Sequence, residues 1–268
     1  MGSDENNADV ASAALYAALA AVYDRWQSFD ETTPFSALAL GKLEPILGRR
    51  RPPVTSFVDL GCGTGELLLA LRARHPDWRL GGVDASAAML SVARAKPNAA
   101  AIEWRTGSLE RADASVGGAR FDVAGAFYDT LNHLPGRAAL AQTFAAVARL
   151  LNPGGVFVFD VTNPLGFRRW WTGNRLWKGD DWQVHLEMAF RPALTDQDDG
   201  IGLAEVTIVE KNITCRATLT ERCFPDPVIR SALAAAGLAV ESAVAWSPFD
   251  IDAPGKTLFV CSKSTSTP

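Results

Sequence analysis

Short apolar runs alternate with helix-like segments through the middle of the chain, and both recur near its end. The apolar runs predict strands at 56–60, 79–83, 102–105, 121–127, 156–161, 238–246 and 257–262. Segments with apolar residues at helical spacing predict helices at 65–74, 85–96, 137–150 and 227–236. Such alternation is typical of βαβ units, whose mainly parallel sheet is covered by helices on both faces. We therefore predict a doubly wound α/β fold built on a mainly parallel, seven-stranded sheet.

Two parts of the chain depart from this alternation. Near the N-terminus, alanine and leucine at helical spacing predict helices over about 8–28 and 34–47. After residue 164 the pattern changes to period-2 stretches without helices between them, which predict antiparallel strands at 183–190, 204–211 and 213–223. We expect three parts: an N-terminal helical cover (1–53), an α/β domain (54–164 and 224–263) and an inserted antiparallel β region (165–223).

Composition and charge set broad limits on function. The 268 residues are 48% hydrophobic, and 26 Lys and Arg against 30 Asp and Glu give a net charge of −4, which argues against nucleic acid as the main partner. The four cysteines contain no C-x-x-C pair and no histidine pattern accompanies them, so we expect neither a disulfide framework nor a metal site. The N-terminus is acidic where a signal peptide is basic, and the longest uncharged run (10–23) is too short to span a bilayer. We therefore expect a cytoplasmic protein with no membrane partner.

The sharpest chemical signal is a glycine-rich turn between the first predicted strand of the sheet and its helix. Gly61, Gly63 and Gly65 follow that strand, and Asp84 lies at the end of the next strand. Glycines let a ligand come close to the backbone, and the start of a helix offers unpaired N–H groups. An acid at the position of Asp84 can accept hydrogen bonds from ribose hydroxyls. The G-x-G-x-G spacing is neither the dinucleotide fingerprint nor a P-loop, so it predicts a nucleoside site.

These segments resemble those of a known family. Asp59-Leu60-Gly61-Cys62-Gly63-Thr64-Gly65 resembles motif I of class I S-adenosylmethionine-dependent methyltransferases, which have a Rossmann-like fold. Gly82-Val83-Asp84-Ala85-Ser86 with Met89-Leu90 is similar to their ribose-binding segment. Ala21-Val22-Tyr23-Asp24 resembles the element that covers the cofactor in small-molecule N-methyltransferases.

The resemblance implies which residues bind S-adenosylmethionine. They are Tyr23, Asp59, Gly61, Gly63, Gly65, Asp84, Ala85, Met89, Ser108, Leu109 and Phe127. The family commonly has Gly-Asp at the adenine position, whereas Gly107 precedes Ser108 here. We therefore expect the backbone at Leu109 to carry more of the adenine contact.

Candidate catalytic residues follow the fourth predicted strand, where open α/β sheets place their ligand crevice. His133 is our first candidate for a base or a substrate hydrogen bond, and Tyr128 is the second. The alternative is that Asn132 and His133 only tie this loop to the sheet. Tyr16, on the first helix, is either a packing residue or part of the site.

Candidate substrate-binding residues are acidic or aromatic. They are Trp26, Asp129, Asp160, Trp170, Trp171 and Trp177. The tryptophans of the inserted region, with arginines beside them, predict an aromatic wall of a substrate pocket, or else they pack the insertion onto the sheet. Asp160 either contacts substrate or accepts hydrogen bonds from turn amides.

Together these features predict an enzyme, a methyltransferase. The expected reaction transfers a methyl group from S-adenosylmethionine to a nitrogen, in preference to an oxygen, of a small metabolite of secondary metabolism, leaving S-adenosylhomocysteine. One alternative is an enzyme that uses the same cofactor without methyl transfer, and another is a non-catalytic nucleoside-binding module. The sequence does not identify the methyl acceptor or the oligomeric state.

Overall fold

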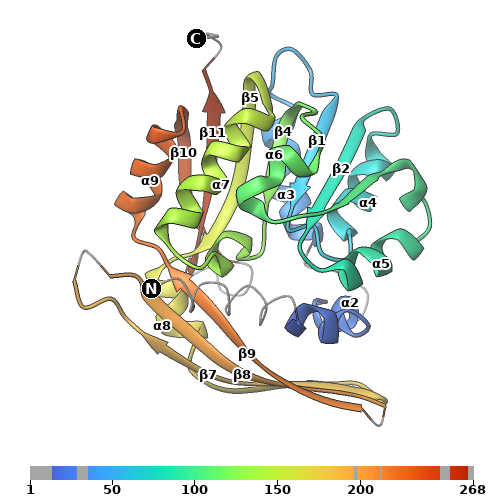
Figure 1. Ribbon diagram of the computed structural model, residues 1–268, viewed down its shortest axis with the longest axis vertical. Helices are drawn as coiled ribbons and strands as arrows, with labels where there is room; N and C mark the ends of the chain where they lie inside the picture. Colours follow the sequence, from blue (N-terminus) through green and yellow to red (C-terminus); the bar gives the residue numbers. More distant parts are fainter. Residues whose placement is uncertain (1–13, 29–35, 196–197, 212, 248–253, 265–268) are drawn as a thin grey trace.

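Seven strands form one sheet through the body of the molecule (Figure 1). The computed structural model describes residues 14–28, 36–195, 198–211, 213–247 and 254–264. The strand order is β10 (Leu238–Trp246), β11 (Lys256–Lys263), β5 (Leu151–Thr162), β4 (Phe121–Ala126), β1 (Ser56–Leu60), β2 (Arg79–Asp84) and β3 (Glu103–Thr106). Strands β5, β4, β1, β2 and β3 are parallel, and β11 is antiparallel to β5 and to β10. The predicted mainly parallel, seven-stranded sheet is confirmed.

Strand β1 lies inside this sheet, between β4 and β2, and its five residues are all buried. A strand covered on both faces needs apolar side chains on both, and Phe57, Val58 and Leu60 supply them. From β1 the chain runs through β2 to β3 on one side and then returns to β4 and β5 on the other side. The order therefore reverses between β1 and β4, and open α/β sheets bind their ligands at such a switch point.

Helices cover both faces of the sheet, as predicted. Those packed on one face are α6 (Ala112–Ser115), α7 (Arg137–Leu150) and α9 (Asp226–Ala235). Those on the other face are α3 (Ser36–Leu47), α4 (Glu66–Arg74) and α5 (Ala87–Ala95). No helix within the described residues is long and apolar enough to cross a membrane.

A second sheet lies beside the first and holds the inserted residues (Figure 1). It consists of β6 (Gly173–Lys178), β7 (Trp182–Arg191), β8 (Gly200–Glu210) and β9 (Ile213–Cys223), each antiparallel to its neighbour. The three predicted antiparallel strands are present, but β6 and the helix α8 (Pro164–Trp170) are not predicted from the sequence. Asn163 caps α8 by accepting hydrogen bonds from the N–H groups of Leu165 (3.0 Å) and Gly166 (3.1 Å), and a proline at the first helical position is typical of such a start.

The N-terminal segment lies between the second sheet and the carboxyl ends of the central strands of the first sheet. The described part is helical at 14–19, turns at 20–22 and continues as α2 (Tyr23–Trp26), so the expected helix over 8–28 is interrupted. Its residues 1–13, and residues 34 and 35 of the next expected helix, lie outside the described residues. Leu15, Leu19 and Val22 pack against apolar side chains of the second sheet. The division into cover, α/β domain and insertion stays a prediction.

Candidate active site

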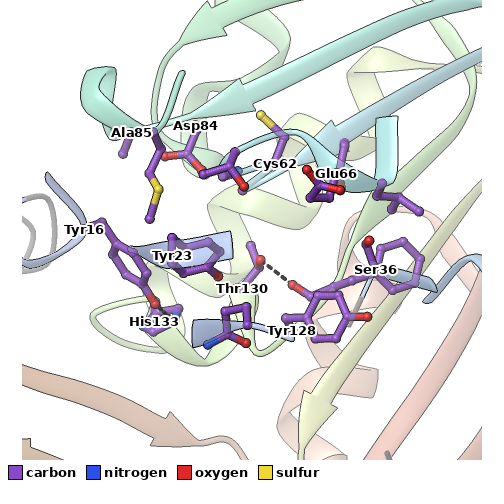
Figure 2. Close-up of a pocket in the computed structure, with 18 of the residues that line it drawn as sticks. Tyr16, Tyr23, Ser36, Cys62, Glu66, Asp84, Ala85, Tyr128, Thr130 and His133 are labelled. Carbon is purple, nitrogen blue, oxygen red and sulfur yellow. Dashed lines mark hydrogen bonds between the residues drawn. The ribbon is translucent and has the colours of Figure 1, made fainter. Parts of the chain in front are cut away.

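A cavity lies at the carboxyl ends of the central strands, between the glycine loop after β1 and the N-terminal segment (Figure 2). It lies at the switch point between β1 and β4. Nine of the predicted cofactor residues line it: Tyr23, Asp59, Gly61, Gly63, Asp84, Ala85, Met89, Leu109 and Phe127. Both predicted catalytic residues, His133 and Tyr128, also line it. Gly65 and Ser108 do not.

The glycine loop is shaped by packing as well as by access to the cavity. Gly65 begins α4 at φ +80°, and a Cβ there would come within 2.4 Å of the Trp104 ring. The absence of a side chain at Gly65 therefore allows the loop to lie on Trp104. At Gly63 (φ +53°) the nearest atom to a Cβ would be a Tyr23 ring carbon at 3.8 Å. The backbone at Gly63 thus leaves space in which a ligand can approach.

Asp84 joins the glycine loop to the end of β2. Its carboxylate accepts hydrogen bonds from the N–H groups of Gly63 and Ser86, each at 2.8 Å. A carboxylate has about four acceptor sites, so Asp84 can still accept hydrogen bonds from ribose hydroxyls. Burial raises the pKa of Asp84, and the two backbone hydrogen bonds oppose that rise.

Asp59 is a second buried acid, on the wall formed by β1. Its side chain is 5% exposed and lines the cavity. Burial, with a further contribution from Asp84, raises the pKa of Asp59 well above its usual value. A cation bound in the cavity would stabilise the ionised form of both acids.

The segment after β3 shows which residues meet the expected adenine position. Gly107 and Leu109 line the cavity, whereas Ser108 precedes the short helix η2 (Leu109–Arg111) and does not. The expectation that the backbone near Leu109 carries more of the adenine contact than the Ser108 side chain stays a prediction.

The short helix α2 forms part of the cavity wall and is held there by ionic contacts. Its Asp24 accepts a hydrogen bond from the Thr64 hydroxyl of the glycine loop. Lys96 lies 2.6 Å from Asp24 and 2.5 Å from Glu66. Asp24, Thr64 and Glu66 all line the cavity; Asp24 and Thr64 belong to the motifs found in the sequence, but none of the three was named there as a binding residue.

The charge of the cavity wall is acidic. Asp24, Asp59, Glu66 and Asp84 line it, and none of the described lining residues is a lysine or an arginine. Lys96 pairs with Asp24 and Glu66, so within the described part of the chain the lining acids without a cationic partner are Asp59 and Asp84. Such a wall favours a ligand that carries positive charge.

Tyr16 and His133 meet at one side of the cavity (Figure 2). The Tyr16 hydroxyl lies 2.9 Å from His133 Nε2, and the two rings make an edge-on contact with centroids 5.5 Å apart. Burial lowers the pKa of His133 to about 4; Asp129 opposes this effect, and Lys256 adds to it. His133 is therefore neutral near pH 7 and can accept a proton, and burial raises the pKa of Tyr16 well above its usual value.

Residues 57–155, less than half of the chain, match a family model described as a methyltransferase domain. This segment is therefore similar to a methyltransferase domain. A predicted methyltransferase of Geobacillus sp. (strain WCH70) is 34% identical over 143 residues, which are 53% of this chain and 51% of that protein. The chain spans about half the length of the curated relatives it matches.

Solved structures show the same fold around the methyltransferase domain. The CcbJ methyltransferase from Streptomyces caelestis has a TM-score of 0.71 and 24% identity, covering 93% of this chain and 98% of that one. The sugar N-methyltransferase KedS8 from Streptoalloteichus sp. ATCC 53650 has a TM-score of 0.65 and 25% identity, covering 85% and 88%. The expected Rossmann-like fold of S-adenosylmethionine-dependent methyltransferases is confirmed.

Next to the cavity of the methyltransferase domain lies a buried ionic cluster. Lys256, 3% exposed, contacts Asp129 and lies 3.1 Å from Asp160, which is fully buried. Burial alone would raise the pKa of Asp129, but Lys256 and a hydrogen bond from Thr162 (2.5 Å) bring it below its usual value. Asp129 and Asp160 do not line the cavity, so their predicted contact with substrate stays a prediction.

The predicted aromatic residues of the substrate region also lie away from the cavity lining. Trp26 of α2 makes an edge-on contact with Trp177 of β6, with centroids 5.9 Å apart. Trp171 is 8% exposed and stacks on Phe167, and Trp170 packs against Gly255. These contacts join the insertion to α2 and to the segment that precedes β11, and a role in substrate binding stays a prediction.

Proposed function

We propose that this protein is an S-adenosylmethionine-dependent methyltransferase that methylates a nitrogen of a small molecule. The observation that carries the proposal is the acidic cavity at the switch point, built on the glycine loop and Asp84, with the Tyr16–His133 pair at its side. Cofactor, nucleophile and proton acceptor would then meet at one edge of the sheet.

The residues present fit this cofactor. S-adenosylmethionine carries a net positive charge, ribose hydroxyls and an adenine, and the wall offers uncompensated acids, free acceptor positions on Asp84 and an open backbone at Gly63. The rings of Tyr16 and Tyr23 can lie beside a sulfonium, because aromatic faces attract cations. When bound, the cofactor supplies a methyl group whose bonding electrons remain on sulfur.

The chain's own residues position the nucleophile and manage its proton. Tyr23, held over the glycine loop by α2, excludes water from the cofactor side of the cavity. Neutral His133 offers a lone pair at Nε2, the atom beside the Tyr16 hydroxyl. A nitrogen nucleophile needs an acceptor for the proton it loses, and holding it at that position also supplies the orientation on which the rate depends.

One of the structural neighbours supports a choice of substrate class to test first. The KedS8 structure is of a sugar N-methyltransferase, and the neutral base at His133 suits an amine acceptor. We infer that amino sugars are the first class to test. Nitrogen is preferred to oxygen because a hydroxyl acceptor needs a stronger base than an imidazole whose pKa is lowered to about 4.

Two measurements test the proposal. Calorimetry compares S-adenosylmethionine binding to the wild type, to Asp84→Ala and to Asp226→Ala, a control acid on α9. Charged hydrogen bonds contribute about 1.5–3 kcal/mol each, so Asp84→Ala should weaken binding roughly tenfold or more, and the control should not change it. Unchanged affinity in Asp84→Ala contradicts the site assignment.

The second measurement identifies the reaction. Methyl-labelled S-adenosylmethionine is incubated with a panel of amino pentoses and amino hexoses, and mass spectrometry locates the label. Label on nitrogen supports the proposal. Consumption of the cofactor without methyl transfer would favour another use of the same fold, and no binding of the cofactor would contradict the proposal altogether.

A further inference from the structure

Glu221 is a buried acid behind the cavity wall, and the proposed reaction gives it no role so far. It lies on β9, is 5% exposed, and has one carboxylate oxygen, Oε2, without a hydrogen-bond partner in the described part of the chain. The basic side chain within ion-pair distance is His133, whose Nε2 lies 3.6 Å from Glu221 Oε1. A buried carboxylate without a cationic partner is costly to the fold, so its position beside a cavity residue points to chemistry.

The position of His133 against Glu221 is fixed by a neighbouring clamp. Asn132, 1% exposed, donates hydrogen bonds to the carbonyl of Arg222 (2.7 Å) and to that of Thr162 (3.3 Å). Its carbonyl oxygen accepts a hydrogen bond from the Thr162 N–H at 2.9 Å. The turn η3 (Thr130–His133) is therefore joined to both β5 and β9. As a result His133, which follows Asn132, and Glu221, which precedes Arg222, are held close to each other.

The same nitrogen of His133 faces two groups. Nε2 lies beside the Tyr16 hydroxyl, on the cavity side, and beside the Glu221 carboxylate, away from it. A proton that reaches Nε2 from the cavity is therefore within reach of the carboxylate. Nδ1, the other ring nitrogen, is buried without a partner among the described residues.

The surroundings make Glu221 the stronger base of the two. Burial raises the pKa of Glu221 well above its usual value; Asp129 and Asp160 raise it further, and Lys256 opposes them. Burial lowers the pKa of His133 to about 4. The usual order, in which histidine is the stronger base, is reversed. The groups that face Glu221 are Tyr16 and His133 at the cavity, Asp129 before η3, Asp160 on β5 and Lys256 on β11.

We propose that Glu221 is the final acceptor of the proton that the substrate amine loses, and that His133 passes this proton from the cavity to Glu221. The inference rests on the proposed function, because it requires an amine acceptor. The N–H bond of the methylated amine breaks, the proton binds Nε2 directly or by way of the Tyr16 hydroxyl, and an O–H bond then forms on Glu221. His133 returns to its neutral form, and the Glu221 carboxylate becomes a neutral acid.

The charge balance favours this direction. Before the reaction a positively charged cofactor and the Glu221 carboxylate are both held away from water; afterwards the cofactor product and Glu221 have each lost a charge, and the amine is neutral as it was at the start. Loss of a separated pair of charges is favourable where the surroundings solvate charge poorly. Glu221 acts through His133 and is a positioning residue, since it does not line the cavity.

The first arm of the experiment needs no methyl transfer. Carbon-13 NMR of the full chain, with labelled glutamate and histidine side chains, follows both groups from acid to neutral pH. The Glu221 signal is identified by its absence in Glu221→Gln, and the chain has three histidines, so His133→Gln identifies the other signal. The proposal expects the Glu221 midpoint at higher pH than the His133 midpoint. The opposite order overturns it.

The second arm measures the reaction with the amino sugar of the panel that accepts the labelled methyl group. Glu221→Gln should lower kcat at neutral pH by at least about tenfold, since general acid–base catalysis commonly contributes about 10²–10⁴-fold. Its KM for S-adenosylmethionine should stay within about twofold, because it makes no cavity contact. In the wild type, the fall of kcat toward acid pH should have its midpoint at the Glu221 NMR midpoint. This fall of kcat should persist in Glu221→Asp and should vanish in Glu221→Gln.

The control is Glu205→Gln, on the neighbouring strand β8, whose carboxylate is exposed and accepts a hydrogen bond from Thr218 (3.1 Å). It should leave kcat and its pH profile unchanged. A merely structural role for Glu221 would raise KM or lower the unfolding midpoint without moving the acid limb, and that result contradicts the relay. If no amine of any kind is methylated, the proposed function fails and the relay fails with it, whereas the NMR order still reports whether the two groups are coupled.

Discussion

Replacing Asn132 with alanine tests the clamp on which the site geometry depends. The side chain is 1% exposed and makes hydrogen bonds with the Thr162 N–H (2.9 Å), the Thr162 carbonyl (3.3 Å) and the Arg222 carbonyl (2.7 Å). Alanine leaves these three backbone groups without that partner inside the protein. An unsatisfied buried group costs about 1–3 kcal/mol of stability. A carbonyl oxygen that keeps a hydrogen bond at its second acceptor position costs least. We therefore expect Asn132→Ala to lower the free energy of unfolding by about 3–5 kcal/mol in total.

The assay is equilibrium unfolding in urea, followed by tryptophan fluorescence and circular dichroism. A loss of about 3–5 kcal/mol is a large part of the 5–15 kcal/mol that a typical domain has, so the midpoint should fall clearly while the slope stays constant. Asn174→Ala, at an exposed position of β6, is the control and should change stability by less than about 0.5 kcal/mol. A loss below about 1 kcal/mol in Asn132→Ala would refute the reasoning, because such a loss means that water or other groups replace all three bonds.

Two further substitutions test the glycine loop and the ionic cluster. Gly65→Ala should destabilise the fold by about 2–4 kcal/mol, because a residue at φ +80° is strained and its Cβ would overlap the Trp104 ring; calorimetric unfolding measures this, and a loss below about 0.5 kcal/mol contradicts it. Lys256→Met should destabilise the protein most at neutral pH and least in acid, since it leaves Asp129 and Asp160 as unpaired buried carboxylates. In the wild type the lowered pKa of Asp129 gives stability that is present above its unfolded pKa and is lost as the pH falls through its folded pKa. Urea unfolding at several pH values should therefore show the difference between wild type and variant shrinking toward acid, and a constant difference would contradict the pairing.

The local pattern of apolar and polar residues was sufficient to predict most strands and helices of the α/β part of the chain. The predicted strand 56–60 and helix 137–150 agree with β1 and α7 residue for residue. Buried parallel strands need continuous apolar runs and their helices need apolar stripes, so each element is specified by its own residues. The elements missed include the short helix α6, the helix α8 and the strand β6. Around α8 and β6 the frequent Trp, Arg and Gly residues obscure both the helical and the strand periodicity, and packing against neighbouring strands decides the conformation.

The residues expected to bind the cofactor follow strand ends in order, so the sequence could place them near one another; nine of them line the cavity, and their role in binding stays a prediction. Glu221 and Lys256 were not assigned to the site, although Glu221 falls on the same face of β9 as the buried Leu219 and Cys223, a pattern that marks a buried acid. A local sequence pattern does not show how close in space two segments lie when they are far apart in the chain. Glu221 and His133 are 88 positions apart, and they meet because the clamp at Asn132 joins η3 to β9.

The sequence by itself therefore determined the alternation of strands and helices, the glycine loop and the acid that follows it, since each depends on the backbone preferences and burial of neighbouring residues. The tertiary structure alone decided which charges are compensated. Lys96 pairs with Asp24 and Glu66, Lys256 pairs with Asp129, and Glu221 is left facing His133. The physical reason is that the pKa of a buried group depends on burial and on charges a few ångströms away, and the fold brings those charges together from distant parts of the chain.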